Sequence, residues 1–190
     1  RPPAAATQST TPLLKEGDIG PTPLRRLTRY EFENTLEEVL SNRLKAPYRD
    51  AITGRYEASK IDSLVPSDIP GESGFENDAH RLGRLKPPLR ELADGVNHAL
   101  GKFRKDPVAM KAVLGRANIP ESVGGIEIRK MISDFILRAY RGNGERLPEY
   151  VAAYDGLYEE HLKSSKDTAA SLFHVLEMIL VSPEFLYRIE

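Results

Sequence analysis

Apolar residues recur at intervals of three and four positions through most of the second half of the chain. Three such stripes follow one another after Gly125, and each is long enough for a helix of a globular protein. The stripes are Ile128, Met131, Ile132, Phe135, Ile136, Ala139 and Tyr140; then Tyr150, Val151, Tyr154, Leu157, Tyr158 and Leu162; then Ala169, Leu172, Phe173, Leu176, Ile179 and Leu180. No strand-like alternation of comparable strength occurs, so this region is predicted to be a three-helix bundle.

The first half of the chain has a well-marked helix start. Thr28 and Glu31 have capping-box spacing, and Leu27 and Phe32 have the spacing of a hydrophobic staple. The apolar stripe that begins there contains Phe32, Leu36, Val39, Leu40 and Leu44, and it ends before Pro47. A second stripe contains Leu89, Leu92, Val96, Leu100 and Phe103, and a short third helix is predicted from Asp106-Pro107 to Gly115.

The remaining segments have no helical period. Residues 1–23 have linker composition and are predicted to be a flexible or partner-bound arm. Residues 47–85 form a long irregular loop, with Phe75 as the expected hydrophobic anchor. The chain is therefore predicted to be all-α with two helical units. The first is a helical domain over residues 24–116, and the second is a helical bundle domain over residues 117–190 that ends in a junction segment.

Composition excludes several classes of site. The chain has 190 residues and no cysteine, which rules out disulfides, thiolate metal sites, cysteine nucleophiles and covalent c-type haem attachment within it. A formal net charge of −1 gives no general attraction to nucleic acid, and no recognition-helix motif accompanies the basic clusters. No apolar run is long enough for a membrane span.

Metal and cofactor sites are not predicted. The chain has four histidines, which are His80, His98, His161 and His174, and none has a neighbour at metal-ligand spacing. His161 and His174 lie on successive predicted helices and could meet as axial haem ligands, but surface or rim positions are the favoured interpretation. Glu72, Asp78 and Asn77 could bind a cation, although their spacing is not that of a calcium loop.

Catalytic residues are not predicted either. The adjacent carboxylates Glu37 and Glu38, and likewise Glu159 and Glu160, diverge by about 100° on a helix and cannot converge on one substrate atom. The chain also lacks a nucleophile elbow, a phosphate-binding loop and a dinucleotide fingerprint.

The polar residues around the first helix are interpreted as structural. We expect Arg25 or Arg26 to pair with a carboxylate such as Glu76, which would tie the irregular loop to the helix. We also expect Asn34 and Asn77 to satisfy backbone groups of that loop. With the capping and anchoring residues, the predicted structural motif comprises Arg25, Arg26, Thr28, Glu31, Asn34, Phe75 and Asn77.

The segment from Ser182 to Glu190 begins like a helix. Ser182 suits the N-cap, Pro183 the first position, and Glu184 the positive end of the helix dipole. No terminating signal follows, so we expect a piece of something longer or a segment that lies against a partner. Phe185, Leu186, Tyr187 and Ile189 are expected to be half-exposed. The predicted interface residues are Phe185, Leu186, Tyr187 and Arg188.

Two stretches resemble a known family. The first reads R-R-L-T-R-Y-E-F-E-N-T-L over residues 25–36, with G-F-E-N over residues 74–77. The second reads F-I-L-R-A-Y-R over residues 135–141, with M-I-L-V-S-P-E-F-L-Y-R-I-E over residues 178–190. Together they resemble planctomycete-type multidomain exported proteins of unknown function, which often also carry a c-type cytochrome domain. The chain departs from the family pattern at Glu37-Glu38 and at Gly142-Asn143-Gly144.

The resemblance implies an exported protein, periplasmic or at the cell surface, without an assigned reaction. It favours a noncatalytic helical assembly module that packs on another subunit or on the remainder of its parent polypeptide, with a c-type cytochrome among the implied partners. An alternative is a fragment of a carbohydrate-active or redox enzyme whose catalytic groups lie mainly in a downstream domain. A DNA-binding helical protein is a third, weaker interpretation.

Overall fold

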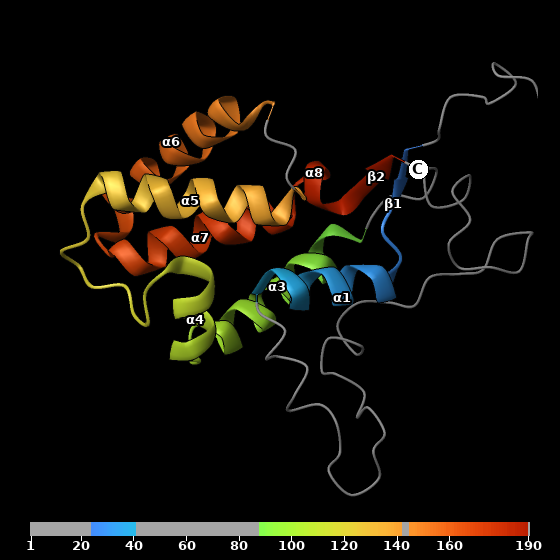
Figure 1. The fold of residues 1–190 in the computed structure, drawn as a ribbon, viewed down its shortest axis with the longest axis horizontal. Coiled ribbons are helices and arrows are strands. Elements are labelled where there is room, and N and C mark those ends of the chain that lie inside the picture. The colour runs from blue at the N-terminus through green and yellow to red at the C-terminus, as the bar shows by residue number, and fades with distance from the viewer. Residues whose placement is uncertain (1–23, 41–87, 142–144, 190) are drawn as a thin grey trace, which may run out of the picture.

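The computed structural model describes residues 24–40, 88–141 and 145–189 (Figure 1). Within these ranges the regular secondary structure is helical apart from two short strands, which confirms the all-α prediction. The elements are β1 (Leu24–Arg26), α1 (Arg29–Leu40), α3 (Leu89–Phe103), α4 (Pro107–Leu114), α5 (Gly125–Ala139), α6 (Leu147–Ser165), α7 (Thr168–Leu180), α8 (Pro183–Leu186) and β2 (Tyr187–Ile189). Several predictions fall outside the described residues, namely the arm 1–23, the end of the first helix near Leu44, and Phe75, Glu76 and Asn77 of the long loop.

Local capping explains where the helices begin. The Thr28 hydroxyl accepts a hydrogen bond from the Glu31 amide at 3.2 Å, and the Glu31 carboxylate accepts one from the Thr28 amide at 3.0 Å. These are the two reciprocal bonds of the expected capping box. At α4, Asp106 accepts hydrogen bonds from the amides of Val108 and Ala109 at 2.9 and 3.0 Å. Gly115 ends this helix with a φ of 74°, a left-handed conformation that glycine adopts without a steric cost.

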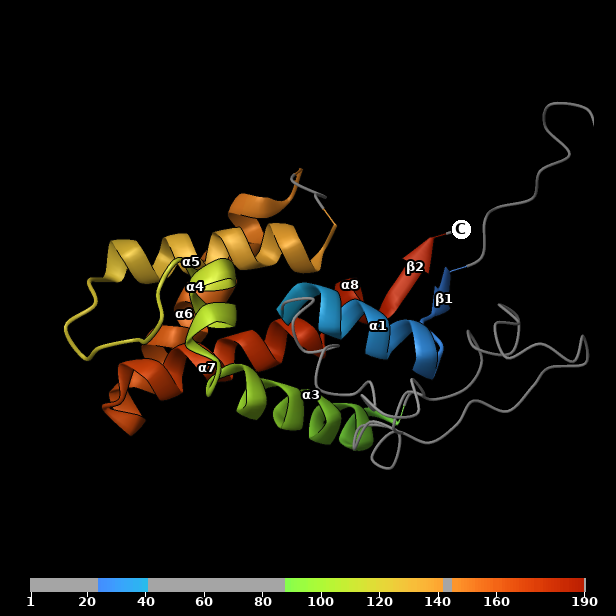
Figure 2. The same cartoon turned by 60° about the horizontal axis from the view of Figure 1, so that its bottom comes forward.

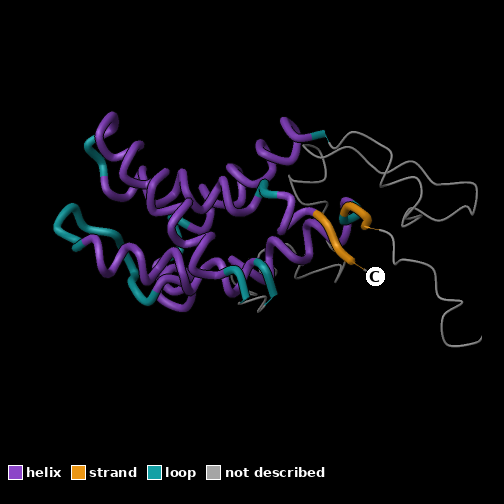
Figure 3. Tube along the Cα trace, turned by 90° about the horizontal axis from the view of Figure 1, so that it is seen from above, coloured by secondary structure: helices purple, strands orange, loops and turns teal. Residues whose placement is uncertain are grey.

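Helices α5, α6 and α7 form the predicted bundle, with α7 next to α3, α5, α6 and α8 (Figures 1 and 2). Figure 3 shows that helices make up most of the described chain. Seven of the 13 residues of α7 are buried, whereas only Tyr158 is buried among the 19 residues of α6. The sequence pattern placed the start of α6 near Tyr150, and the helix begins slightly earlier at Leu147, where Pro148 fits its first turn.

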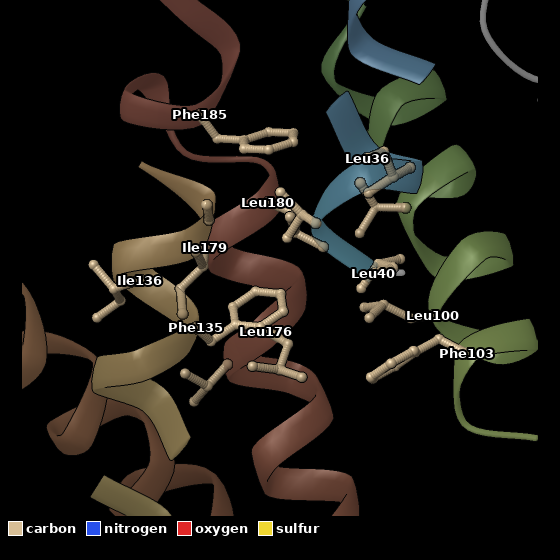
Figure 4. Packing of buried hydrophobic residues seen from close by; sticks show 14 of the residues in the cluster. Leu36, Leu40, Leu100, Phe103, Phe135, Ile136, Leu176, Ile179, Leu180 and Phe185 are labelled. Atoms are coloured by element: carbon tan, nitrogen blue, oxygen red, sulfur yellow. The ribbon is translucent and has the colours of Figure 1, made fainter. Parts of the chain in front are cut away.

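The buried side chains of both predicted units form one hydrophobic cluster. Figure 4 shows Leu36 and Leu40 of α1 and Phe103 of α3 in this cluster with Leu176 and Leu180 of α7. The two halves of the chain therefore share a core, while the domain boundaries at residues 116 and 117 stay a prediction.

The strands β1 and β2 were not predicted from the sequence. The two strands pair antiparallel, with Arg26 opposite Tyr187 and Arg25 opposite Arg188 (Figure 2). The Leu27 amide extends the pairing by donating a hydrogen bond to the Leu186 carbonyl at 2.7 Å. Strands of three residues are too short to show the alternation by which a strand is detected in a sequence.

The expectation that Phe185 and Leu186 are exposed is wrong. Ser182 caps α8 by accepting a hydrogen bond from the Phe185 amide at 3.3 Å, as its position suggested. The helix then makes a single turn and the backbone becomes extended at Tyr187. That turn directs Phe185 and Leu186 into the core, where they are 0% and 2% exposed, and leaves Glu184 at the surface.

Candidate functional site

Those residues of the predicted structural motif that the structure describes lie in β1, in α1 and between them. Arg25 forms a two-pronged ion pair with Glu31, with Nη1–Oε2 and Nη2–Oε1 distances of 2.6 and 2.9 Å. Hydrogen bonding from this guanidinium is the main reason why the pKa of Glu31 falls to about 2. The structure gives Arg25 the carboxylate of the capping box, six residues away in the chain. Glu76, a carboxylate expected to pair with Arg25 or Arg26, lies outside the described residues, so that pairing stays a prediction.

The other motif residues of this region also make local contacts. Arg26 Nη1 donates to the Leu27 carbonyl at 2.9 Å, and Asn34 Nδ2 donates to the Tyr30 carbonyl at 2.9 Å. The Asn34 amide was expected to serve the long loop, and this bond instead lies within α1. The anchoring of the loop by Phe75 and Asn77 stays a prediction.

Of the predicted interface residues, Tyr187 is half-buried, and the side chain of Arg188 lies outside the described part.

A hydrogen-bond network that sequence reasoning missed joins α5, α6 and α8. The Tyr140 hydroxyl lies 2.8 Å from the Tyr154 hydroxyl and 2.9 Å from Ser182 Oγ. Ser182 Oγ in turn donates to the Ile179 carbonyl at 2.8 Å. Burial is the main reason why the pKa of Tyr140 rises well above its usual value. The signal in the sequence was the presence of tyrosine at two positions of the apolar stripes, where a buried hydroxyl needs a partner.

A groove of about 550 Å³ lies between α5 and α6. Its lining residues are Arg129 and Ser133 from α5, and Leu147, Pro148, Val151, Ala152 and Asp155 from α6. Arg129 reaches across the groove to Asp155, with an Nε–Oδ2 distance of 3.0 Å. The hydrogen bond raises the pKa of the Arg129 guanidinium, which stays charged. The groove therefore combines an apolar wall from α6 with an ion pair that spans it.

A second groove, of about 320 Å³, lies between α3, α6 and α7. Its lining residues are Asn97, Leu100, Gly101, Arg104, His161, Ala170, Phe173, His174 and Glu177. The Arg104 guanidinium lies over the Phe173 ring, 5.3 Å from the ring centre. Asn97 Nδ2 donates to Glu177 Oε1 at 2.7 Å.

The two histidines of the second groove meet, and their geometry does not suit axial haem ligation. The rings of His161 and His174 are stacked, with their centroids 4.6 Å apart and their planes inclined by 26°. Stacked rings leave no space between them for a haem. Among the described residues, no group of three or more acidic or histidine side chains is arranged to hold a metal ion. Of the other histidines, His98 is half-buried on α3, and His80 lies outside the described ranges.

The carboxylate pairs considered from the sequence remain separate from both grooves. Glu159 and Glu160 are exposed on α6, and Glu38 is exposed on α1. Glu72 and Asp78 lie in a part of the chain that the structure does not describe.

None of the described helices is long and apolar enough to cross a membrane.

Comparison with known proteins gives one family match. The family model described as "PSD5: Protein of unknown function (DUF1595)" matches residues 127–190, which run from the first turn of α5 to the end of the chain. The first groove and the tyrosine network lie within this segment, whereas β1, the pairing partner of β2, lies outside it. No curated protein and no solved structure shows significant similarity to the chain. Over residues 127–190, the chain is thus similar to a family without an assigned function.

Proposed function

We propose that this chain is a noncatalytic helical assembly module that packs against another domain or subunit through the groove between α5 and α6. The observation that carries the proposal is the poor burial of α6, which has one buried residue in 19. In a globular protein, a helix gains most of its stability by burying an apolar face.

The apolar residues of α6 are numerous but only partly covered. They are Leu147, Tyr150, Val151, Tyr154, Leu157 and Leu162, and all are half-buried against the core. An apolar surface left open along a helix is typical of a contact with another protein. A partner that covered the groove would therefore stabilise α6 by burying its half-exposed apolar side chains.

The neighbouring face of α5 continues this surface. Ile126, Ser133 and Leu137 are spaced by seven and four positions, which places them on one side of the helix. Ile126 is 89% exposed and Leu137 is 36% exposed. Ser133 between them lines the groove, so the apolar surface extends past the groove along α5.

The partner that fits this surface is an apolar face of a helix from another domain or subunit. Such a helix would fill the groove with its own side chains, in the manner of helix-in-groove recognition. The Arg129–Asp155 pair is largely exposed on the arginine side, where an ion pair contributes little. Polar groups of the partner could compete for these two side chains and set the register of the contact.

The compartment and the class of partner are further parts of the proposal. Export to the periplasm or the cell surface, and a c-type cytochrome in the assembled complex, are supported by the resemblance of the two sequence stretches. The match of residues 127–190 to a family of unknown function is compatible with a module of this kind and assigns no partner to it.

The test is an assembly measurement with a matched pair of variants on α6. Val151→Arg places a charge in the groove, and Glu160→Arg places the same side chain on the exposed face of the same helix. Each variant is made in the complete encoded polypeptide, and its complexes are measured by sedimentation velocity. The proposal expects Val151→Arg to dissociate the complex or loosen the domain contact while Glu160→Arg leaves it intact. Unchanged assembly in both variants, with the fold preserved, would contradict it.

A further inference from the structure

We propose that the groove between α3, α6 and α7 binds a compact oxyanion, such as sulfate or phosphate, and binds it more tightly in acid. The groove is of a size found for small-molecule sites, and hydrogen-bond donors reach it from all three helices or their ends. This site is separate from the proposed assembly surface, because the two grooves have no lining residue in common.

Arg104 is the fixed positive charge of the groove. Its guanidinium lies with its carbon 5.3 Å from the centre of the Phe173 ring, a cation–π contact that uses the flat face of the group. The N–H bonds of a guanidinium lie in its plane and point away from a ring that it covers. A tetrahedral oxyanion is a suitable acceptor for them, since arginine binds such groups with two parallel hydrogen bonds.

Hydrogen bonding assigns the tautomer of His161. The Ser171 hydroxyl has one proton, and its shortest contact is to the Asp167 carbonyl at 2.7 Å, where it must donate. Its lone pairs then accept from the Ser165 hydroxyl and from Nδ1 of His161, each at 3.0 Å. Neutral His161 therefore carries its proton on Nδ1, and Nε2 is the nitrogen that gains a proton in acid.

Protonation of His161 creates a donor without breaking this network. Because Nδ1 remains a donor to Ser171, the new N–H on Nε2 is available to a ligand. Among the described residues, neither Nε2 of His161 nor the ring of His174 has a hydrogen-bond partner or is fully enclosed. An anion in the groove can accept from both rings.

The charges of the groove determine the direction of the pH dependence. Apart from the histidines, its charged residues are Arg104 from the end of α3 and Glu177 from α7, and α6 contributes His161 alone. The Asn97 amide binds Glu177 Oε1. The groove is therefore close to neutral when both histidines are neutral and positive when they are protonated. Two positive rings 4.6 Å apart repel each other, and an anion beside them reduces that repulsion.

Sulfate is the best probe because its charge stays constant between pH 5 and pH 8. The imidazole resonances of His161 and His174 are followed by NMR during a sulfate titration, with chloride at equal ionic strength as the reference. The proposal expects saturable shifts of both rings and an affinity about tenfold higher at pH 5.5 than at pH 8, as expected for one to two added charges near the ion. Shifts no larger than those in chloride, or equal affinity at both pH values, would overturn it.

Two charge-removing variants distinguish a specific sulfate site in the groove from general attraction of anions to positive charge. Arg104→Gln and Lys163→Gln each remove one exposed positive charge, but only Arg104 lines the groove. The proposal expects at least a fivefold loss of sulfate affinity in Arg104→Gln, with little change in Lys163→Gln. Equal losses in the two variants would show that sulfate responds only to net charge. His161→Gln should reduce the pH dependence, because only His174 then gains charge in the groove, and circular dichroism checks that each variant is folded.

Discussion

Phe185 of α8 packs edge-on against Phe32 of α1, with the ring centroids 6.1 Å apart and the ring planes at 75°. Both side chains are fully buried. The pair lies next to the pairing of β1 with β2, since Leu27 and Leu186 are hydrogen-bonded at the end of that pairing. Residues 24–32, at the start of the described chain, and residues 185–189, at its end, therefore meet in space and stabilise each other.

Phe185→Ala should destabilise the chain by about 3–5 kcal/mol, because it removes a large buried ring and leaves a cavity beside Phe32. The free energy of unfolding is measured by urea denaturation. Tyr30→Ala removes an aromatic side chain that is 71% exposed and should cost less than about 1 kcal/mol. Similar losses in both variants would contradict the placement of Phe185 in the core.

Glu31→Gln should destabilise the chain by about 1–3 kcal/mol at pH 7, since it weakens the capping box and removes the charge that pairs with buried Arg25. Because folding lowers the pKa of Glu31 from 4.5 to about 2, its stabilisation is complete above pH 4.5 and is lost as the pH falls towards 2. The difference between wild type and variant should shrink over this window. A difference that stays constant down to pH 2 would exclude the ion pair as its cause. Glu160→Gln, on the exposed face of α6, is the control.

Tyr140→Phe should cost about 1 kcal/mol at neutral pH, because it removes the hydroxyl that bonds Tyr154 and Ser182. Folding raises the pKa of Tyr140, so above about pH 10 the unfolded chain releases this proton more readily than the folded chain does. Stability should therefore fall as the pH rises through 10, and Tyr140→Phe should reduce that fall. Urea denaturation at pH 7 and pH 11 measures both effects. An unchanged alkaline loss would show that Tyr140 ionises as easily in the folded protein.

Features that depend on neighbouring residues in the sequence could be predicted. The helix α4 is an example, because Asp106, Pro107 and Gly115 mark its start and its end within ten positions. The Thr28–Glu31 capping box is another, and its two bonds are present. In each case the signal and the structure that it causes lie within a few turns of one helix.

Features that depend on contacts between distant segments could not be predicted. β1 is stabilised by a strand from the other end of the described chain, and neither strand is long enough to show a period. The burial of Phe185 depends on its contact with Phe32, far away in the chain, so the exposure of Phe185 was misjudged. His161 and His174 could be assigned to successive helices, but their stacking depends on how α6 and α7 are rotated and on Ser171 between them. Residues 41–87, where Phe75 and Asn77 lie, are outside the described part.

Hydrogen exchange of α6 tests the central claim, that the groove between α5 and α6 is an assembly surface, most directly. The exchange rates of residues 147–165 are compared between the isolated chain and the complete encoded polypeptide in its purified complex. The account predicts that amides around Val151 and Asp155 exchange at least tenfold more slowly in the complex, and that Val151→Arg removes this added protection. Equal exchange of α6 in the isolated chain and in the complex would contradict the proposed assembly surface.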